Sequence, residues 1–132
     1  MKKLLLIILL IIGCGTKSPS IESLLHKHLN IDIPNKYEII KDSKSDNIYG
    51  QSQRFITLKF NKEELHKVSN SIDELISTGQ NKIKERSGHW TKHSSSYIFS
   101  GDALTKTDWN ASVVSQINLN DQILNYILTY NK

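Results

Sequence analysis

Apolar residues recur at helical spacing in two segments of the chain. The first segment starts behind Ser18 and Ser20, either of which can cap a helix, and ends near Asn30. Its apolar stripe is Ile21, Leu24, Leu25, His28 and Leu29. The second starts at Asn61, with Glu64 three residues on as in a capping box, and stops at Gly79. Its stripe is Leu65, Val68, Ile72, Leu75 and Ile76. Each helix therefore has one face that needs an apolar surface to cover.

Alternating apolar and polar residues predict strands elsewhere. Before the second helix we expect a hairpin whose strands, 37–41 and 54–60, are joined by a long polar loop over 42–50. After it, the expected strands are 90–92, 97–100, 109–117 and 123–130, with turns at Ser94-Ser95 and over 118–121. The last two should pair with each other. In the final strand, the pattern points Leu124, Tyr126 and Leu128 inward.

Short turns between successive strands favour antiparallel pairing, and two one-sided helices favour a sheet beneath them. We therefore predict an α+β fold, with one twisted antiparallel sheet of about 4–6 strands and both helices packed on one face. The chain has 132 residues, enough for one hydrophobic core, and we assign residues 21–132 to a single domain.

The first residues have a different pattern. Lys2 and Lys3 precede nine apolar residues, 4–12, and Gly13 and Cys14 follow. A permanent membrane-spanning helix needs roughly 20 apolar residues, so this run is too short for one. A basic start, a short apolar core and a small residue at the cut are typical of a secretory signal peptide.

The end of this segment, Ile11-Ile12-Gly13-Cys14, resembles the lipobox of bacterial lipoproteins. The resemblance implies cleavage between Gly13 and Cys14 and attachment of a diacylglyceryl group to the Cys14 thiol. Residues 1–13 would then be the signal peptide, and residues 14–20 the lipidated cysteine and a short tether. The membrane would be a partner through the lipid on Cys14. The alternatives are a buried core cysteine or an uncleaved anchor.

Composition and charge agree with export more than with nucleic-acid binding. The formal charge of +4 falls to +2 when Lys2 and Lys3 leave with the signal peptide, and we expect no nucleic acid as a partner. The only cysteine is the lipidated one, so the mature domain has no internal disulfide. Gly15 is not the Asp that retains lipoproteins at the inner membrane in the best-known sorting rule. We therefore expect outer-membrane attachment facing the periplasm.

No motif in the chain predicts catalysis. His26 and His28 are two apart in a helix and point in different directions, and His89 and His93 lie in a strand-and-turn region where their spacing has no fixed geometry. The serines at 94–96 lack a G-x-S-x-G or S-x-x-K context. We expect no cofactor, no metal site and no enzymatic activity.

Two groups of residues could instead bind a partner. Aromatic residues gather in the C-terminal half, and Trp90, Tyr97 and Trp109 are the candidates for partner binding, with ordinary sheet core as the alternative. Lys82, Lys84 and Arg86 could meet an anionic partner, although a solvated loop explains them more simply.

Three classes of function remain open from the sequence. The first is a membrane-anchored, non-catalytic binding or envelope-associated module with a protein partner. The second is an immunity-type lipoprotein that neutralises a toxin. The third is a small hydrolase or metal-dependent enzyme, which would need His, Asp and Ser side chains converging in a cleft.

Overall fold

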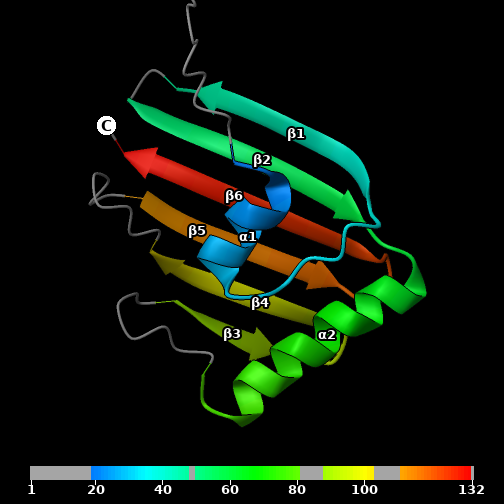
Figure 1. The fold of residues 1–132 in the computed structure, drawn as a ribbon. Helices are drawn as coiled ribbons and strands as arrows, with labels where there is room; N and C mark the ends of the chain where they lie inside the picture. Colours follow the sequence, from blue (N-terminus) through cyan, green and yellow to red (C-terminus); the bar gives the residue numbers. More distant parts are fainter. Residues whose placement is uncertain (1–18, 48–49, 81–87, 103–110, 132) are drawn as a thin grey trace, which may run out of the picture.

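A computed structural model describes residues 19–47, 50–80, 88–102 and 111–131 (Figure 1). It has two helices and one open six-stranded antiparallel sheet, so the predicted α+β class is confirmed. The elements in chain order are α1 (Ile21–Leu29), β1 (Glu38–Asp46), β2 (Gln51–Lys59), α2 (Lys62–Ser77), β3 (His89–Lys92), β4 (Ser96–Asp102), β5 (Ala111–Asn118) and β6 (Ile123–Asn131).

The sheet has the strand order β1-β2-β6-β5-β4-β3. Strands β3 to β6 follow one another as a meander, and the predicted pairing of the last two strands is confirmed with Val113 opposite Leu128. The β1–β2 hairpin joins this meander through β2 and β6, with Ile56 opposite Tyr126. The last strand therefore lies at the centre of the sheet, between segments far apart in the sequence.

Both helices begin and end as their sequences predict. The Ser20 hydroxyl caps α1 by accepting from the Ser23 amide at 3.2 Å, and Asn30 closes it in the left-handed conformation. The Asn61 side chain caps α2 by accepting from the Glu64 amide at 2.9 Å. Gly79, with φ of +70°, ends that helix at a conformation that favours glycine.

The two helices lie on the same face of the sheet, as predicted (Figure 1). Trp90 donates from its indole nitrogen to the Leu29 carbonyl at the end of α1, and the Tyr97 hydroxyl donates to Asp73 of α2. Both aromatic residues share the sheet face that carries the core side chains. The strand residues of this core are Ile56, Leu58, Trp90, Tyr97, Phe99, Ala111, Val113, Ile117, Leu124, Tyr126 and Leu128.

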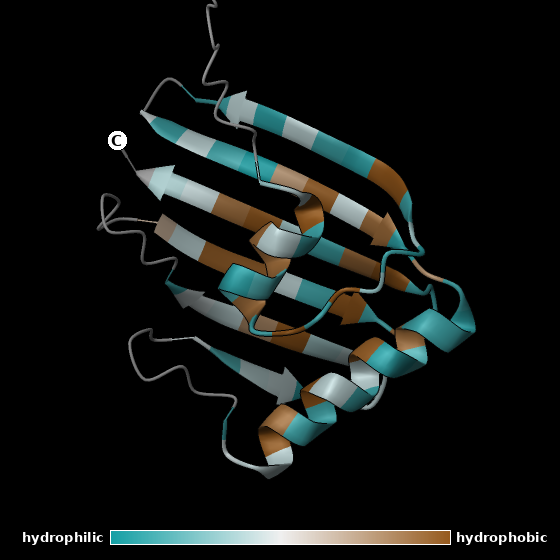
Figure 2. Ribbon diagram, in the orientation of Figure 1, coloured by the Kyte–Doolittle hydropathy of each residue, from teal (hydrophilic) through white to brown (hydrophobic). Residues whose placement is uncertain are grey.

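The first hairpin differs from its prediction. Strand β1 runs to Asp46 and β2 starts at Gln51, so most of the expected loop over 42–50 is strand. Figure 2 shows that β1 is largely hydrophilic beyond its first residues. It therefore lacks the alternation of apolar and polar residues that predicts a strand. Its polar side chains are held by the neighbouring strand, where Arg54 donates to both Asp42 oxygens at 3.0 and 2.9 Å. Within the described ranges, no helix is long and apolar enough to cross a bilayer.

Candidate functional site

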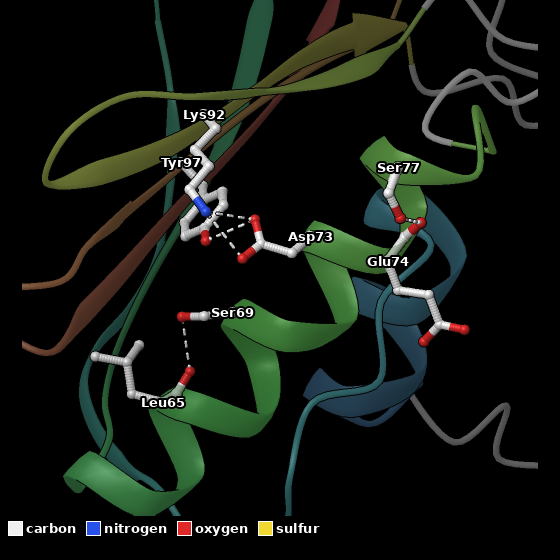
Figure 3. A network of polar contacts seen from close by, with 7 residues as sticks. All are labelled: Leu65, Ser69, Asp73, Glu74, Ser77, Lys92 and Tyr97. Carbon is white, nitrogen blue, oxygen red and sulfur yellow. Dashed lines mark hydrogen bonds and ion pairs between the residues drawn. The ribbon is translucent and has the colours of Figure 1, made fainter.

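A groove of about 300 Å³ runs between α2 and the sheet. We call it the α2 groove. It is lined by Lys62, Leu65, His66, Ser69, Asn70, Asp73, Tyr97 and Leu119. Figure 3 shows three of its lining residues on α2, Leu65, Ser69 and Asp73, with Asp73 directed at Tyr97 and Lys92. Leu65 and Leu119 supply apolar surface, and the other lining residues carry polar groups. Most of the lining comes from one stripe of α2 that borders its buried face, because residues three, four and seven apart share a helix side.

Asp73 is the groove residue that connects α2 to the β3–β4 hairpin. It accepts from the Lys92 ammonium at 2.9 Å on each carboxylate oxygen and from the Tyr97 hydroxyl at 2.9 Å. The hydrogen bonds from Lys92 and then Tyr97 lower the pKa of Asp73, although burial opposes them. Lys92 also sits over the Tyr97 ring, 5.4 Å from its centroid. The carboxylate is therefore ionised and held in a fixed position.

The side chains beside Asp73 have hydrogen-bond partners of their own. Ser69 donates its hydroxyl proton to the Leu65 carbonyl at 2.9 Å, while the His66 ring pairs with the Asn70 amide at 3.2 Å. A serine nucleophile needs its hydroxyl directed at the base that activates it. Here each group has a different partner, so the groove presents fixed hydrogen-bonding groups beside an apolar floor.

A second, larger hollow of about 510 Å³ lies where the segment before β1 meets the start of α2. Its lining is Lys36, Tyr37, Glu38, Lys59, Phe60, Asn61 and Gln122. The Tyr37 hydroxyl donates to Glu22 at 2.5 Å, and burial together with this carboxylate raises the pKa of Tyr37 to about 12. This hydrogen bond links α1 to the segment before β1, so Tyr37, which lines the hollow, has a structural role.

A buried polar pair lies beneath α1. The His28 side chain, on the apolar stripe predicted from the sequence, contacts the Tyr126 hydroxyl through Nδ1, and the two rings stack at 6.0 Å between centroids. Burial raises the pKa of Tyr126. This pair lines neither of the two hollows described above.

The other histidines are dispersed over the described surface. His26 forms an exposed pair with Asp32 at 2.9 Å, whereas His89 and His93 lie in and just after β3 with exposed side chains. Across residues 19–47, 50–80, 88–102 and 111–131, no three His, Cys, Asp or Glu side chains are grouped to hold a metal ion.

The structure places two of the three candidate partner-binding aromatics in the core. Trp90 and Tyr97 are each 2% exposed, because alternation along β3 and β4 turns them toward the helices. They therefore form no exposed platform, although the Tyr97 hydroxyl reaches the α2 groove. Trp109, Gly13, Cys14 and the basic run Lys82, Lys84 and Arg86 lie outside the described residues.

Sequence reasoning missed Asp73, the residue that organises the groove. The available signal was its place on the helix: Asp73 follows Ile72 of the buried stripe, and residues at such a boundary can reach both the sheet and solvent. Its partners were not predictable, because Lys92 and Tyr97 come from a hairpin about twenty residues further along the chain.

Removing the Asp73 charge should change the acid dependence of stability. Because the folded pKa of Asp73 is lowered, its stabilising contribution is present above the unfolded value of about 3.9 and is lost as pH falls through the folded value. We expect Asp73→Asn to melt below the wild type at pH 7, and the difference to vanish in acid. Thermal melts from pH 7 to pH 2 measure this. Glu74→Gln makes the same charge change without touching Lys92, and an equal effect from it would contradict the assignment.

The architecture defines a class, an α+β protein with an open antiparallel sheet and both helices on one face. Comparisons of the chain with protein-family models, with curated proteins and with solved structures gave no match.

Proposed function

We propose that this protein is a lipid-anchored protein of the bacterial envelope that works by binding another protein. The observation that carries the anchor is the sequence Ile11-Ile12-Gly13-Cys14, which follows a basic start and a nine-residue apolar run. Each buried methylene of an attached lipid is worth about 0.8 kcal/mol, so two or three acyl chains hold a protein stably on a bilayer. The lipid supplies attachment, and the domain is then free to present its surface to partners.

The position of α1 supports a close attachment. Helix α1 starts at Ile21, capped by Ser20, so only residues 15–20 separate its first turn from Cys14. Six residues span at most about 20 Å when fully extended. The domain would therefore stay near the membrane surface, within reach of proteins attached to the same membrane.

The α2 groove supports binding as the activity. Its central carboxylate is ionised and already accepts three hydrogen bonds, which suits a fixed recognition surface more than a proton-transferring one. The apolar floor and polar walls match the composition of protein interfaces, in which a small apolar area is surrounded by polar groups. A polar peptide segment of the partner, with one apolar side chain over Leu65 and Leu119, would satisfy this lining.

The anchor is tested by Cys14→Ser in cells labelled with a fatty acid. We expect the variant to lose the label completely and to leave the membrane fraction or remain as an uncleaved precursor. Ser18→Ala, which leaves the lipobox intact, should keep both label and location. Unchanged labelling of Cys14→Ser would refute the lipidation.

Binding is tested separately with the full-length protein carrying an affinity tag at its C-terminus. Chemical cross-linking in cells, followed by purification, should recover a defined envelope protein with the wild type. Asn70→Arg, which places a bulky charge in the groove, should reduce this recovery strongly, whereas Asn35→Arg outside the groove should not. Equal recovery with both variants would exclude the groove as the binding surface.

A further inference from the structure

The sheet has a second face, which no described helix or loop covers. We call it the open face. Strand residues alternate between the two faces, so the neighbours of the core residues point to it. Its central members form one cross-strand row: Phe55 opposite Ile127, Ile127 opposite Val114, and Val114 opposite Ser100. Val114 is 45% exposed, so this row includes apolar surface that is open to solvent.

Apolar side chains occupy the centre of the open face, and polar ones surround them. Strands β6 and β5, which carry Ile127 and Val114, are third and fourth in the order of six. Ile98 of β4, half-buried, extends the apolar surface on one side. Lys41 lies on the other side, with its ammonium 5.2 Å from the centroid of the Phe55 ring. A central apolar cluster with a polar rim is the usual anatomy of a protein interface.

Two pairs of polar side chains on the open face are hydrogen-bonded across neighbouring strands. The Thr57 hydroxyl donates to the Asn125 side chain at 3.0 Å, and the Gln53 amide donates to the Thr129 hydroxyl at 3.3 Å. Covering a polar group costs little free energy when its hydrogen bond is already made within the protein. Burying this face therefore keeps one hydrogen bond in each of the two pairs.

We propose that the open face is the contact surface of a homodimer, in which two copies pack sheet against sheet around a two-fold axis near Ile127 and Val114. A two-fold axis through the centre of the face places the apolar cluster of one copy on that of the other, which makes a self-complementary contact. Sheets packed face to face keep their strands within about 30° of each other. The helices and the α2 groove then lie on the outer sides of the dimer and stay accessible.

The area of the open face is close to what a second copy of the chain would cover. Six strands about 4.8 Å apart, with an average length of roughly 25 Å, give a face of about 700 Å². A stable protein–protein interface buries about 800 Å² on each partner, so the open face is close to the area that one further copy requires.

Pairing through a sheet edge is disfavoured by comparison. The long edge strand, β1, has an irregularity between Ile39 and Lys41 and carries Lys41, Asp42 and Lys44. Irregular, charged edges oppose the addition of another strand. These features of β1 favour self-association through the open face over association through the sheet edge.

The test uses two full-length copies with different C-terminal tags, co-expressed and solubilised from membranes in mild detergent. We expect wild-type copies to co-purify and sedimentation to give the protein mass of two chains. Val114→Glu should weaken association by at least roughly tenfold, because an unpaired carboxylate would be buried at the centre of the contact. Gln116→Arg, an exposed position on the same face and strand, is a second variant should Val114→Glu fold poorly.

Ile39→Glu is the matched control. Ile39 is 51% exposed, close to the exposure of Val114, but it pairs with Leu58 and so lies on the helix side of the sheet. This variant should dimerise like the wild type. A wild type that is monomeric at all concentrations would overturn the proposal, and so would a dimer that survives both face variants or is lost with Ile39→Glu. Because none of these substitutions changes a groove residue or the lipobox sequence, these results leave the binding and lipidation tests unaffected.

Discussion

Trp90→Ala is expected to destabilise the domain by about 3–5 kcal/mol, the usual cost of truncating a large buried aromatic side chain. Trp90 is 2% exposed and packs against Phe99 with ring centroids 5.4 Å apart. Its indole also donates to the Leu29 carbonyl at 2.9 Å, so it links the edge of the sheet to the end of α1. The measurement is the free energy of unfolding in urea, followed by circular dichroism.

Two further variants separate the parts of this effect. Trp90→Phe keeps an aromatic ring but removes the donor to Leu29, and we expect an intermediate loss. Thr91→Ala, at the neighbouring exposed position on the opposite face, should change stability by no more than about 0.5 kcal/mol. The hypothesis that Trp90 anchors a partner makes the opposite prediction: Trp90→Ala would keep its stability and lose only binding.

His28→Ala is expected to lower the free energy of unfolding by about 2–4 kcal/mol. Removing the imidazole takes the histidine partner from the buried Tyr126 hydroxyl, and an unpaired buried group costs about 1–3 kcal/mol. The lost ring also leaves a void between α1 and the sheet, where it stacked on Tyr126. His26→Ala is the matched control two residues earlier on the same helix. Its side chain is 60% exposed, so its effect should stay below about 1 kcal/mol.

Tyr126, the partner of His28, should make the stability of the protein depend on pH in alkaline solution. Burial raises the pKa of Tyr126, so the folded protein holds this proton more tightly than the unfolded chain does. The resulting stabilisation is complete below the unfolded value of about 10 and is lost as pH rises above it. Wild-type stability should therefore fall more steeply above pH 10 than that of Tyr126→Phe. Parallel slopes for the two proteins would show that Tyr126 does not contribute.

Helices and inward-facing strand residues were predictable because their signals are local. A cap such as Ser20 or Asn61 acts on amides within three residues, and helical or strand periodicity repeats within one element. The sequence could not predict the second half of β1, whose side chains have no apolar alternation. Pairing with β2 and the contact between Asp42 and Arg54 hold that segment extended.

The candidate site was less accessible to sequence reasoning than the fold. The sequence indicates Tyr97 only as an aromatic candidate. Its alternation in β4 buries the ring and leaves only the hydroxyl at the groove. Asp73 gains its role from Lys92 and Tyr97, and that meeting depends on α2 packing beside the β3–β4 hairpin.

The sequence alone determined the α+β class, the ends of both helices, the pairing of the last two strands and the inward set Leu124, Tyr126 and Leu128. The tertiary structure decided that β6 joins β2 at the centre of the sheet and that His28 meets Tyr126. It also decided that one face of the sheet, which no helix or loop among the described residues covers, has an apolar centre. The physical reason is the range of the forces involved. Caps and periodicity act over a few residues, whereas these contacts join segments up to about a hundred residues apart, and only burial in the folded chain selects them.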